Sequence, residues 1–469
     1  MRSPGFGCVS AVRIDSPGST TKARAVAGRP AFDPRLLISL WMYWYSRGIS
    51  SAREISRRCE YEPAFQWLTG RNVVNHHTLS DFRIEHRQAM DELFTQGLAV
   101  LSSEGLVTLE RVTHDGTKVY AHASKKSFRV KKRIEEHLKM AREQVQAMVQ
   151  QEGDLEPRRR AAQARAQRER EQPLSRALAE YERINAAKRP GYNRTSKQQT
   201  GASTSDPDAR IMRHSASPCA LSYNVQVSTD TAAGIVVAID TTQTAPDYEH
   251  LLPAMQQIER RTGKRPKQVV VDAGYTSREN VIALQRFGVA MFGRSIETDG
   301  RVQQRFERCG VKEGFLPDAF RLDATTNTFI CPRDKVLRPR RAEERPGRTM
   351  VRYQASVADC KTCTQRENCC FGNTRYGRSI VVTKGHPIVT AFRAQTSSPE
   401  GEAALKQRSQ VAEFVNAWIK EKLGLRRFPV RGIAKVRAEA MWAALTYNVQ
   451  QWIRLRWQPL RGAAQLSNA

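Results

Sequence analysis

The sequence lacks any apolar run long enough to cross a lipid bilayer, which takes roughly 18–20 residues. Its longest apolar run, Leu36–Tyr45, is about half that length and predicts a helix packed inside the protein. Met1–Thr21 is polar and has no continuous apolar core, so it does not resemble a secretory signal. These absences predict a cytoplasmic protein with no membrane partner.

Acidic residues are scarce relative to basic ones. Lys and Arg number 76 against 47 Asp and Glu, which gives a formal net charge of +29 and a pI near 10.2. A net positive charge of this size attracts polyanions, and nucleic acid is the first candidate for a binding partner. The plainer interpretation is a basic protein whose charges are only solvated. With 469 residues, the chain is long enough for two or three domains.

Cysteines are odd in number: the chain has nine, and four of them crowd between Cys360 and Cys370. Such a set favours a metal or free thiols in a reducing compartment over a disulfide framework. Cys360 and Cys363 form a C-x₂-C pair, and one Cys upstream and one downstream complete the four ligands that tetrahedral zinc takes. We predict a structural Zn²⁺ on Cys331, Cys360, Cys363 and Cys369, with Cys370 able to replace Cys369. The alternative is a set of reduced thiols.

Two aspartates accompany strand-like segments. Val269–Val271 is a run of β-branched residues that predicts a buried strand, and Asp272 follows where Ala-Gly lets the chain turn. Chemistry often collects at the carboxyl ends of such strands, although a lone Asp there can equally begin a turn or cap a helix. Leu106–Tyr120 predicts another strand, with Asp115 at the end of its apolar run.

The apolar spacing predicts the order β-β-β-α-β-α-β, which is that of the ribonuclease-H-like fold, an α/β mixed sheet flanked by helices. After Leu106–Tyr120 the elements are expected at Leu221–Thr229, Gly234–Asp240, Tyr248–Thr262, Val269–Val271, Ser277–Phe287 and Val289–Phe292. The charged stretch 125–190 predicts a helical insert, broken at Pro157 and Pro173. Asn193–Asp208 is expected to be a polar linker.

Five segments follow from these patterns. Residues 1–27 lack periodicity and are expected to be disordered or spurious, and 28–104 form an all-α domain in which Ser51–Glu54 is a capping box. Residues 105–293 hold the first part of the catalytic fold, 294–400 a Cys-rich insert that is expected to bind zinc, and 401–469 the closing helices. The basic surface of the all-α domain predicts contacts with DNA phosphates, and its arginines are Arg47, Arg53, Arg57, Arg58 and Arg71.

The closing helices offer a third carboxylate. Leu405–Leu423 has an apolar stripe on one side, and Glu413, Asn416 and Lys420 lie together on the other because they are three and seven residues apart. Cutting or joining a phosphodiester uses divalent ions held about 3.5–4 Å apart. Mg²⁺ takes oxygen ligands, so two aspartates on strands and one helical glutamate suit that chemistry.

Several segments, in order along the chain, resemble those of bacterial insertion-sequence transposases of the DDE superfamily. The N-terminal ones are Gly28–Pro34, Ser50–Glu54 and Thr78–Arg83. The others are Asp115–Ser124, Asp206–Met212, Tyr223–Gln226, Val271–Ser277, the Arg408, Glu413 and Lys420 set, Gly424–Phe428, and Arg431 with the glycine after it.

The resemblance implies a DNA transposase that cuts at the ends of its element and transfers the freed strands. Asp115, Asp272 and Glu413 would then be catalytic and would hold Mg²⁺ or Mn²⁺, as two ions. Arg408, Lys420, Lys118 and Arg431 would contact DNA phosphates. The implied partners are double-stranded DNA, as terminal inverted repeats and target, and further copies of the chain in a homodimer or larger assembly at the nucleoid.

Other interpretations stay open. Leu405 stands where the family often has a tyrosine, which leaves room for a DNA-binding relic that represses transposition without chemistry. A ribonuclease-H-like metallonuclease without strand transfer is a third possibility. Four more aspartates lie near the expected strands, and they are Asp206, Asp208, Asp230 and Asp240. Asp240 ends an equally apolar run, but on the third strand, where the family carries no essential carboxylate.

Overall fold

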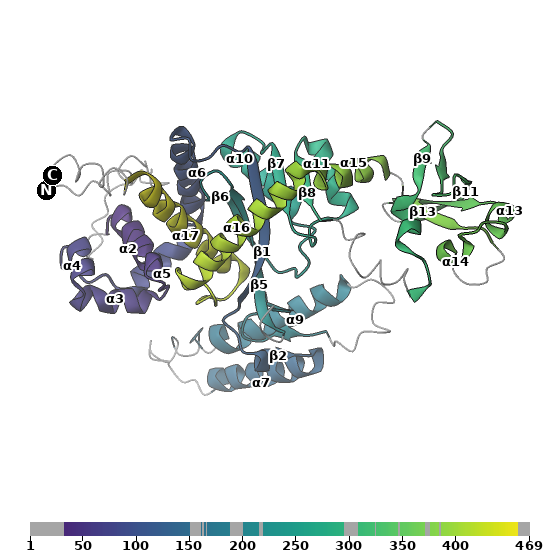
Figure 1. Ribbon diagram of the computed structural model, residues 1–469. Helices are drawn as coiled ribbons and strands as arrows, with labels where there is room; N and C mark the ends of the chain where they lie inside the picture. Colours follow the sequence, from purple (N-terminus) through teal and green to yellow (C-terminus); the bar gives the residue numbers. More distant parts are fainter. Residues whose placement is uncertain are drawn as a thin grey trace, which may run out of the picture. The chain divides into compact units, whose positions relative to one another are not determined.

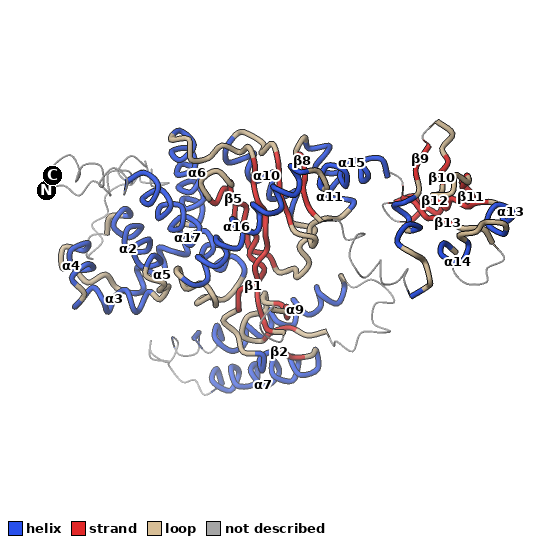
Figure 2. The backbone as a smooth tube through the Cα atoms, in the orientation of Figure 1, coloured by secondary structure: helices blue, strands red, loops and turns tan. Residues whose placement is uncertain are grey.

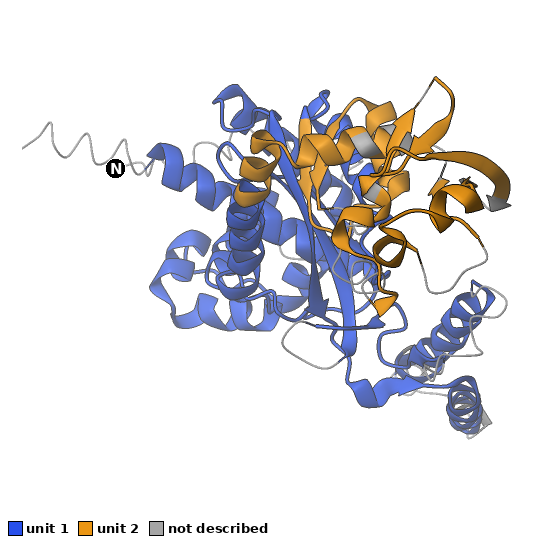
Figure 3. Cartoon of the chain, turned by 45° about the vertical axis from the view of Figure 1, so that its right-hand side comes forward, with its two compact units in different colours: residues 1–267, 407–469 blue, residues 268–406 orange. Residues whose placement is uncertain are grey.

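The computed structural model describes residues 32–150, 161, 164–165, 167–187, 200–214, 219–294, 308–323, 325–345, 348–370, 376–383 and 386–457. The segment 1–27, which was expected to be disordered or spurious, lies outside these residues. The chain divides into two compact units, residues 1–267 with 407–469 (unit 1) and residues 268–406 (unit 2) (Figure 3). Within the described ranges, no helix is both long and apolar enough to cross a membrane.

The N-terminal part of unit 1 is helical. Its helices are α2 (Pro34–Ser46), α3 (Ala52–Tyr61), α4 (Pro63–Thr69), α5 (His76–Glu85) and α6 (Arg87–Ser103). Helix α2 begins with Pro34, where the missing N–H costs nothing, and Asp33 accepts a hydrogen bond from the N–H of Arg35. Helix α3 begins at the predicted capping box, since the Ser51 hydroxyl accepts the N–H of Glu54 at 3.4 Å.

Helix α17 (Ile433–Trp452) joins these helices to the sheet of unit 1 and leads into η8 (Ile453–Trp457). It contacts α2, α5, α6 and strand β6 (Ile235–Thr242) (Figure 1). Trp442 of α17 is fully buried, and its ring stacks on that of Tyr45 with the centroids 6.2 Å apart. The helices of residues 34–103 therefore share one core with the sheet.

Strand β5 (Ala220–Asp230) is the centre of the sheet in unit 1. One edge pairs antiparallel with β1 (Arg111–Tyr120), and the other pairs with β4 (Arg210–Met212) and β6 (Figure 2). Every residue of β5 after the first is buried. Helix α10 (Leu251–Thr262) follows β6 and buries Leu251, Met255 and Ile258, as its apolar spacing predicts.

The predicted strand Leu106–Tyr120 begins later than expected and continues past Asp115. Leu106 and Leu109 are buried but precede β1, and Leu109 has a φ of 57°. The carboxylate of Asp230 holds this turn by accepting the N–H groups of Thr108 at 2.9 Å and Leu109 at 2.7 Å. Asp115 consequently lies in the middle of β1, because β5 continues to pair with β1 as far as Tyr120.

The charged insert forms a helical hairpin. Its elements are η2 (Lys125–Ser127), β2 (Phe128–Arg129), α7 (Lys131–Gln150), η3 (Gln167–Glu171), α9 (Gln172–Ala186) and β3 (Ala202–Ser203). Helices α7 and α9 contact each other around Ile134 and Ala177. The predicted break at Pro173 is wrong, because η3 runs directly into α9 and Pro173 lies in the first turn of α9, whereas Pro157 lies outside the described residues. The expected linker is wrong where it is described, because β3 pairs with β2 and Asp206 is buried.

Unit 2 contains strands that belong to two different sheets. Strand β7 (Gln268–Val271) pairs in parallel with β8 (Ala290–Gly293) across helix α11 (Arg278–Phe287), close to the predicted boundaries. A separate five-stranded sheet has the order β13-β12-β11-β10-β9. Its strands are β9 (Arg321–Asp323), β10 (Thr328–Ile330), β11 (Val336–Arg345), β12 (Arg348–Ala355) and β13 (Ser379–Thr383).

Unit 2 also contains short helices, of which the last contacts α11 and β8. They are η6 (Glu313–Phe315), η7 (Pro317–Ala319), α13 (Val357–Lys361), α14 (Arg366–Cys369) and α15 (His386–Thr396). Helix α16 (Pro399–Glu421) begins in unit 2 and ends in unit 1. Along the chain, β1, β5, β6, α10, β7, α11 and β8 follow the predicted order. The fold is a mixed α/β, ribonuclease-H-like one preceded by a helical region.

Candidate active site

Asp115 is half-buried in the middle of β1, opposite Val227 of β5. Its Oδ1 accepts the N–H of Gly116 at 3.0 Å. The strand is paired along its whole length, so the position of this carboxylate is set by the ladder rather than by a flexible loop.

Helix α16 supplies two partners to Asp115 from about 300 residues further along the chain. The guanidinium of Arg408 lies 3.1 Å from Oδ1, and the side-chain amide of Asn416 donates to Oδ2 at 2.9 Å. Each carboxylate oxygen therefore has its own partner on α16. The Nε of Arg408 and the Oδ1 of Asn416 are buried without a hydrogen-bond partner in the described structure.

Glu413 lies between these two residues along α16. Its side chain is exposed, and its Oε1 accepts a hydrogen bond from the Ser409 hydroxyl at 3.0 Å. Lys420 lies further along the helix and is half-buried. Burial lowers the pKa of Lys420, and Arg426 lowers it further, whereas the negative charge of Asp115 opposes the shift. Glu413, Asn416 and Lys420 all belong to α16, and their shared face remains a prediction.

Asp272 belongs to unit 2 and directly follows β7. Its Oδ1 accepts the N–H of Gly274 at 2.8 Å, and a Cβ at Gly274 would lie only 3.1 Å from the same oxygen. A side chain at position 274 would therefore press on this carboxylate. Helix α11 is capped by Ser277 and not by Asp272. Asp272 begins a turn and remains half-buried at the carboxyl end of its strand.

Lys118 and Arg431 are engaged within unit 1. The Nζ of Lys118 lies 2.9 Å from Oδ1 of Asp247, and the alternation of side chains along β1 directs Lys118 to the opposite face from Asp115. Burial raises the pKa of Asp247, but hydrogen bonds and the Lys118 ammonium outweigh burial, so the net shift is downward. The Nε of exposed Arg431 donates to the backbone carbonyl of His122 at 3.0 Å.

The face of β1 opposite Asp115 carries a polar network that the sequence patterns did not reveal. His114 is fully buried, and its ring nitrogens lie 2.8 Å from the Ser228 hydroxyl and 3.0 Å from Oε1 of Gln226. The amides of Gln226 and Asn224 both donate to Asp247. Burial lowers the pKa of His114 to about 4, so the ring is neutral. Only the pairing of β1 with β5 brings these groups together.

The competing aspartates have structural partners. Asp206 and Asp208 accept the N–H groups of Gly432 and Ile433 at the start of α17, at 3.1 and 2.9 Å. Asp230 holds the turn before β1. Asp240 pairs with Arg437 at 2.9 Å, and both side chains are about half exposed. These contacts account for the four carboxylates without any role in chemistry.

The predicted zinc ligands gather beside the five-stranded sheet. Cys331, Cys360, Cys363, Cys369 and Cys370 all line one cavity. The sulfur of Cys331 accepts the N–H groups of residues 333 and 335, each at 3.3 Å, and the sulfur of Cys360 accepts that of residue 378 at 3.3 Å. Burial raises the pKa of Cys369 to about 12 and also raises that of Cys360. In the described part of the chain, no group of three or more His, Cys, Asp or Glu is arranged to hold a metal ion.

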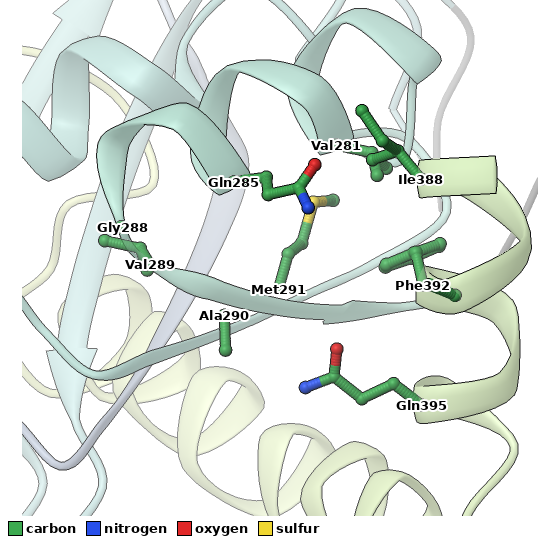
Figure 4. A pocket seen from close by; sticks show the side chains of 10 residues that line it. Val281, Gln285, Gly288, Val289, Ala290, Met291, Ile388, Phe392 and Gln395 are labelled. Carbon is green, nitrogen blue, oxygen red and sulfur yellow. The ribbon is translucent and has the colours of Figure 1, made fainter. Parts of the chain in front are cut away.

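A second cavity in unit 2 lies between α11, β8 and α15 (Figure 4). Apolar side chains, among them Met291 and Phe392, form much of its wall, and Gln285 and Gln395 are its polar groups. Its lining includes no carboxylate, thiol or cation, so it offers nothing for phosphoryl chemistry.

Two family profiles match the chain. The Transposase DDE domain matches residues 330–453, and the DUF772 transposase domain matches residues 14–85. The first match includes Glu413 and the predicted zinc ligands, whereas Asp115 and Asp272 lie outside both. No curated protein matches the chain. Together with the ribonuclease-H-like fold, these two matches support an insertion-sequence transposase of the DDE superfamily.

Proposed function

We propose that the chain binds the ends of its element and catalyses metal-dependent DNA cleavage followed by strand transfer. The observation that carries this proposal is the convergence on Asp115 of Arg408 and Asn416, from the same helix that bears Glu413. A carboxylate with a cation and an amide beside it can orient both a metal ion and a phosphate. Asp272, at the end of its strand in unit 2, would supply the remaining carboxylate.

The donor set fits Mg²⁺ or Mn²⁺, because all three proposed ligands, Asp115, Asp272 and Glu413, offer carboxylate oxygens. Two such ions, when bound, activate the attacking oxygen and stabilise the leaving oxygen. Asn416 would keep Oδ2 of Asp115 oriented, and Arg408 would exchange its contact with Asp115 for a phosphate oxygen of the DNA.

Other basic residues would position the DNA. We propose that Lys420 binds phosphate close to the carboxylates and that Arg431 contacts the backbone further away. Lys118 would contact the backbone only after releasing Asp247 on the opposite face of β1. In the helical region, α3 exposes Arg53 and Arg57, and its partner α4 exposes Trp67. These groups suit a surface that binds the phosphates of duplex ends. The protein would bind the ends as a homodimer or larger assembly at the nucleoid.

The experiment uses Asp272→Asn with a plasmid that carries the native element. The amide keeps an acceptor for the Gly274 N–H but loses the charge that a metal ion needs. The variant should bind the element ends and fail to nick them in Mg²⁺ or Mn²⁺. Asp240→Asn is the matched control and should cut like wild type, because that carboxylate pairs with Arg437. Full cleavage by Asp272→Asn would overturn the assignment of the three carboxylates.

Two other functions are distinguished by the same assay. Leu405, in place of the family's usual tyrosine, packs against Ala404 and Val270, and it motivates the relic interpretation. Wild-type protein that binds ends without cutting would identify a repressor. Cutting without joined products would identify a metallonuclease.

We also propose one structural Zn²⁺ on Cys331, Cys360, Cys363 and Cys369, with Cys370 as the alternative to Cys369. The fit rests on the shared cavity and on the backbone N–H groups that already point at two of the sulfurs. Bound zinc would overcome the raised thiol pKa values, since a coordinated thiol is deprotonated. Four thiolates leave no open position, so this metal would stabilise the fold and take no part in the chemistry.

Elemental analysis of protein purified without chelator tests the zinc site. We expect about one zinc per chain, lost in the Cys360→Ser, Cys363→Ser double variant. Cys219→Ser is the control, because that thiol is exposed and outside the cavity. Zinc content near zero in wild type would identify the cysteines as ordinary thiols.

A further inference from the structure

The hairpin formed by β11 and β12 has one apolar face and one strongly basic face. Leu337, Tyr353 and Ala355 are buried on the first face, in the core of the five-stranded sheet. The register places Arg341 directly opposite Arg352. Arg338 lies on the same outer face, because side chains alternate and the irregularity between Pro339 and Arg341 absorbs one residue. We call Arg338, Arg341 and Arg352 the arginine ribbon.

The charges of the arginine ribbon are not balanced within the described structure. All three side chains are exposed, and no described acidic residue forms an ion pair with any of them. Directly opposed like charges on adjacent strands destabilise a sheet, so the Arg341 and Arg352 pair costs folding free energy. The segment 333–354 holds eight Lys and Arg residues but only three acidic ones. An exposed basic face that lowers the stability of the sheet is well suited to bind an anionic partner.

The chemistry of the ribbon favours duplex DNA over single strands. Guanidinium groups bind phosphate oxygens in a bidentate way, and cross-strand neighbours lie close enough to grip one backbone. Single strands are usually held by aromatic side chains that stack on bases. The described outer face of β11 and β12 offers none, because Tyr353 is turned inward and its hydroxyl donates to Asn327 at 2.8 Å.

We propose that the arginine ribbon binds the phosphate backbone of duplex DNA. The Cys-rich subdomain is then a second DNA-binding surface of the transposase, in addition to the helical region and the carboxylate site. This inference rests on the proposed function and extends it. Backbone contacts carry no sequence information, so the ribbon adds affinity for any duplex, including target DNA.

The test compares wild type with the Arg341→Gln, Arg352→Gln double variant on a duplex of random sequence, over a series of salt concentrations. The variant should bind about tenfold more weakly at low salt, and the slope of log affinity against log salt should fall by about 1.8, because two phosphate contacts are lost. Arg321→Gln is the matched control: it removes an exposed arginine from β9 of the same sheet and should leave the slope unchanged.

Thermal unfolding separates binding from folding. Removal of the opposed charges should leave the melting temperature of the double variant unchanged or raise it, whereas a structural role for the arginines would lower it. An unchanged salt slope, or equal loss in the Arg321→Gln control, would overturn the ribbon while leaving the Asp272→Asn nicking result intact. Wild-type protein that bound no duplex would overturn the ribbon and the proposed function together. Tighter binding of a single strand than of the duplex would also overturn it.

Discussion

Unit 1 contains two arginine–carboxylate pairs whose surroundings differ. Arg83 and Glu439 lie 2.5 Å apart with side chains only 7% and 1% exposed, and Arg408 and Asp115 lie 3.1 Å apart with 15% and 16% exposed. The first pair joins α5 to α17 and is closed over by aromatic rings. The second joins α16 to β1 and keeps some contact with solvent. The same type of ion pair is therefore closed to solvent in one place and accessible to water and ligands in the other.

The first pair is enclosed by aromatic and polar groups of the protein. The ring of Trp41 lies 4.4 Å from the Arg83 guanidinium, and Tyr45 donates its hydroxyl to Glu439. Arg83 also donates to the carbonyl of Ser50 at 3.0 Å. Buried polar atoms without a hydrogen-bond partner occur at both pairs in the described structure: Nε of Arg83 and Oε1 of Glu439 at the first, and atoms of Arg408 and Asn416 at the second. What separates the two pairs is their exposure to solvent: the enclosed pair can only stabilise the fold, whereas the partly exposed pair can also meet a ligand.

The largest effect is expected when the closed pair is broken. Glu439→Ala should lower the free energy of unfolding by about 3–5 kcal/mol, because it leaves the Arg83 charge buried without a partner. Urea unfolding measures the change. The Arg83→Met, Glu439→Leu double variant is the control and should cost much less, since no charge remains buried. Equal losses in the two variants would show that packing, not charge, holds this junction.

A pH effect of about 3 kcal/mol is expected from the face of β1 behind Asp115. The folded-state pKa of His114 is about 4, below the ordinary value of 6.5. The unfolded chain therefore takes up this proton first, so stability is complete above pH 6.5 and is lost as the pH falls toward 4. His114→Gln should flatten the pH dependence of urea unfolding in that range. His77→Gln, at an exposed histidine, should keep the wild-type profile.

A smaller effect is expected at the open pair when its orienting amide is removed. Asn416→Ala should weaken Mn²⁺ binding by about tenfold, because Oδ2 of Asp115 loses the group that orients it. Titration followed by electron paramagnetic resonance gives the affinity. Gln410→Ala, at an exposed position on the same helix, is the control. Mn²⁺ affinity that is equal in both variants would contradict a positioning role.

The smallest effect on stability is expected for Arg408→Gln, at about 1 kcal/mol or less, since the pair is partly solvated. Mn²⁺ affinity should rise, because a positive charge beside Asp115 is removed, while cleavage of element DNA should fall because the phosphate loses its contact. A loss of stability in Arg408→Gln as large as that in Glu439→Ala would show that both ion pairs mainly stabilise the fold.

Local patterns predicted much of this fold. β-branched runs located β7 and the core of β5, and amphipathic spacing located α10 and α11, within a few residues of their observed ends. Ser51 began its helix as its side-chain chemistry predicts. The start of β1 was wrong, because Leu106 and Leu109 are apolar for the sake of burial and not of strand pairing. Apolar residues in a buried turn show neither the strand nor the helix periodicity, so the sequence pattern does not distinguish them from residues of a strand.

The sequence by itself determined the order of strands and helices, the excess of positive charge and the three carboxylates that the family resemblance selects. Those properties depend on side-chain type and on spacing along a few turns of chain. Only the tertiary structure decided that Arg408 and Asn416 meet Asp115, that Asp247 neutralises Lys118, and that Arg341 opposes Arg352. The first two meetings join residues more than a hundred positions apart, and the third depends on a β-irregularity that sets strand register. Contacts of this kind follow from how elements pack, which no local pattern encodes.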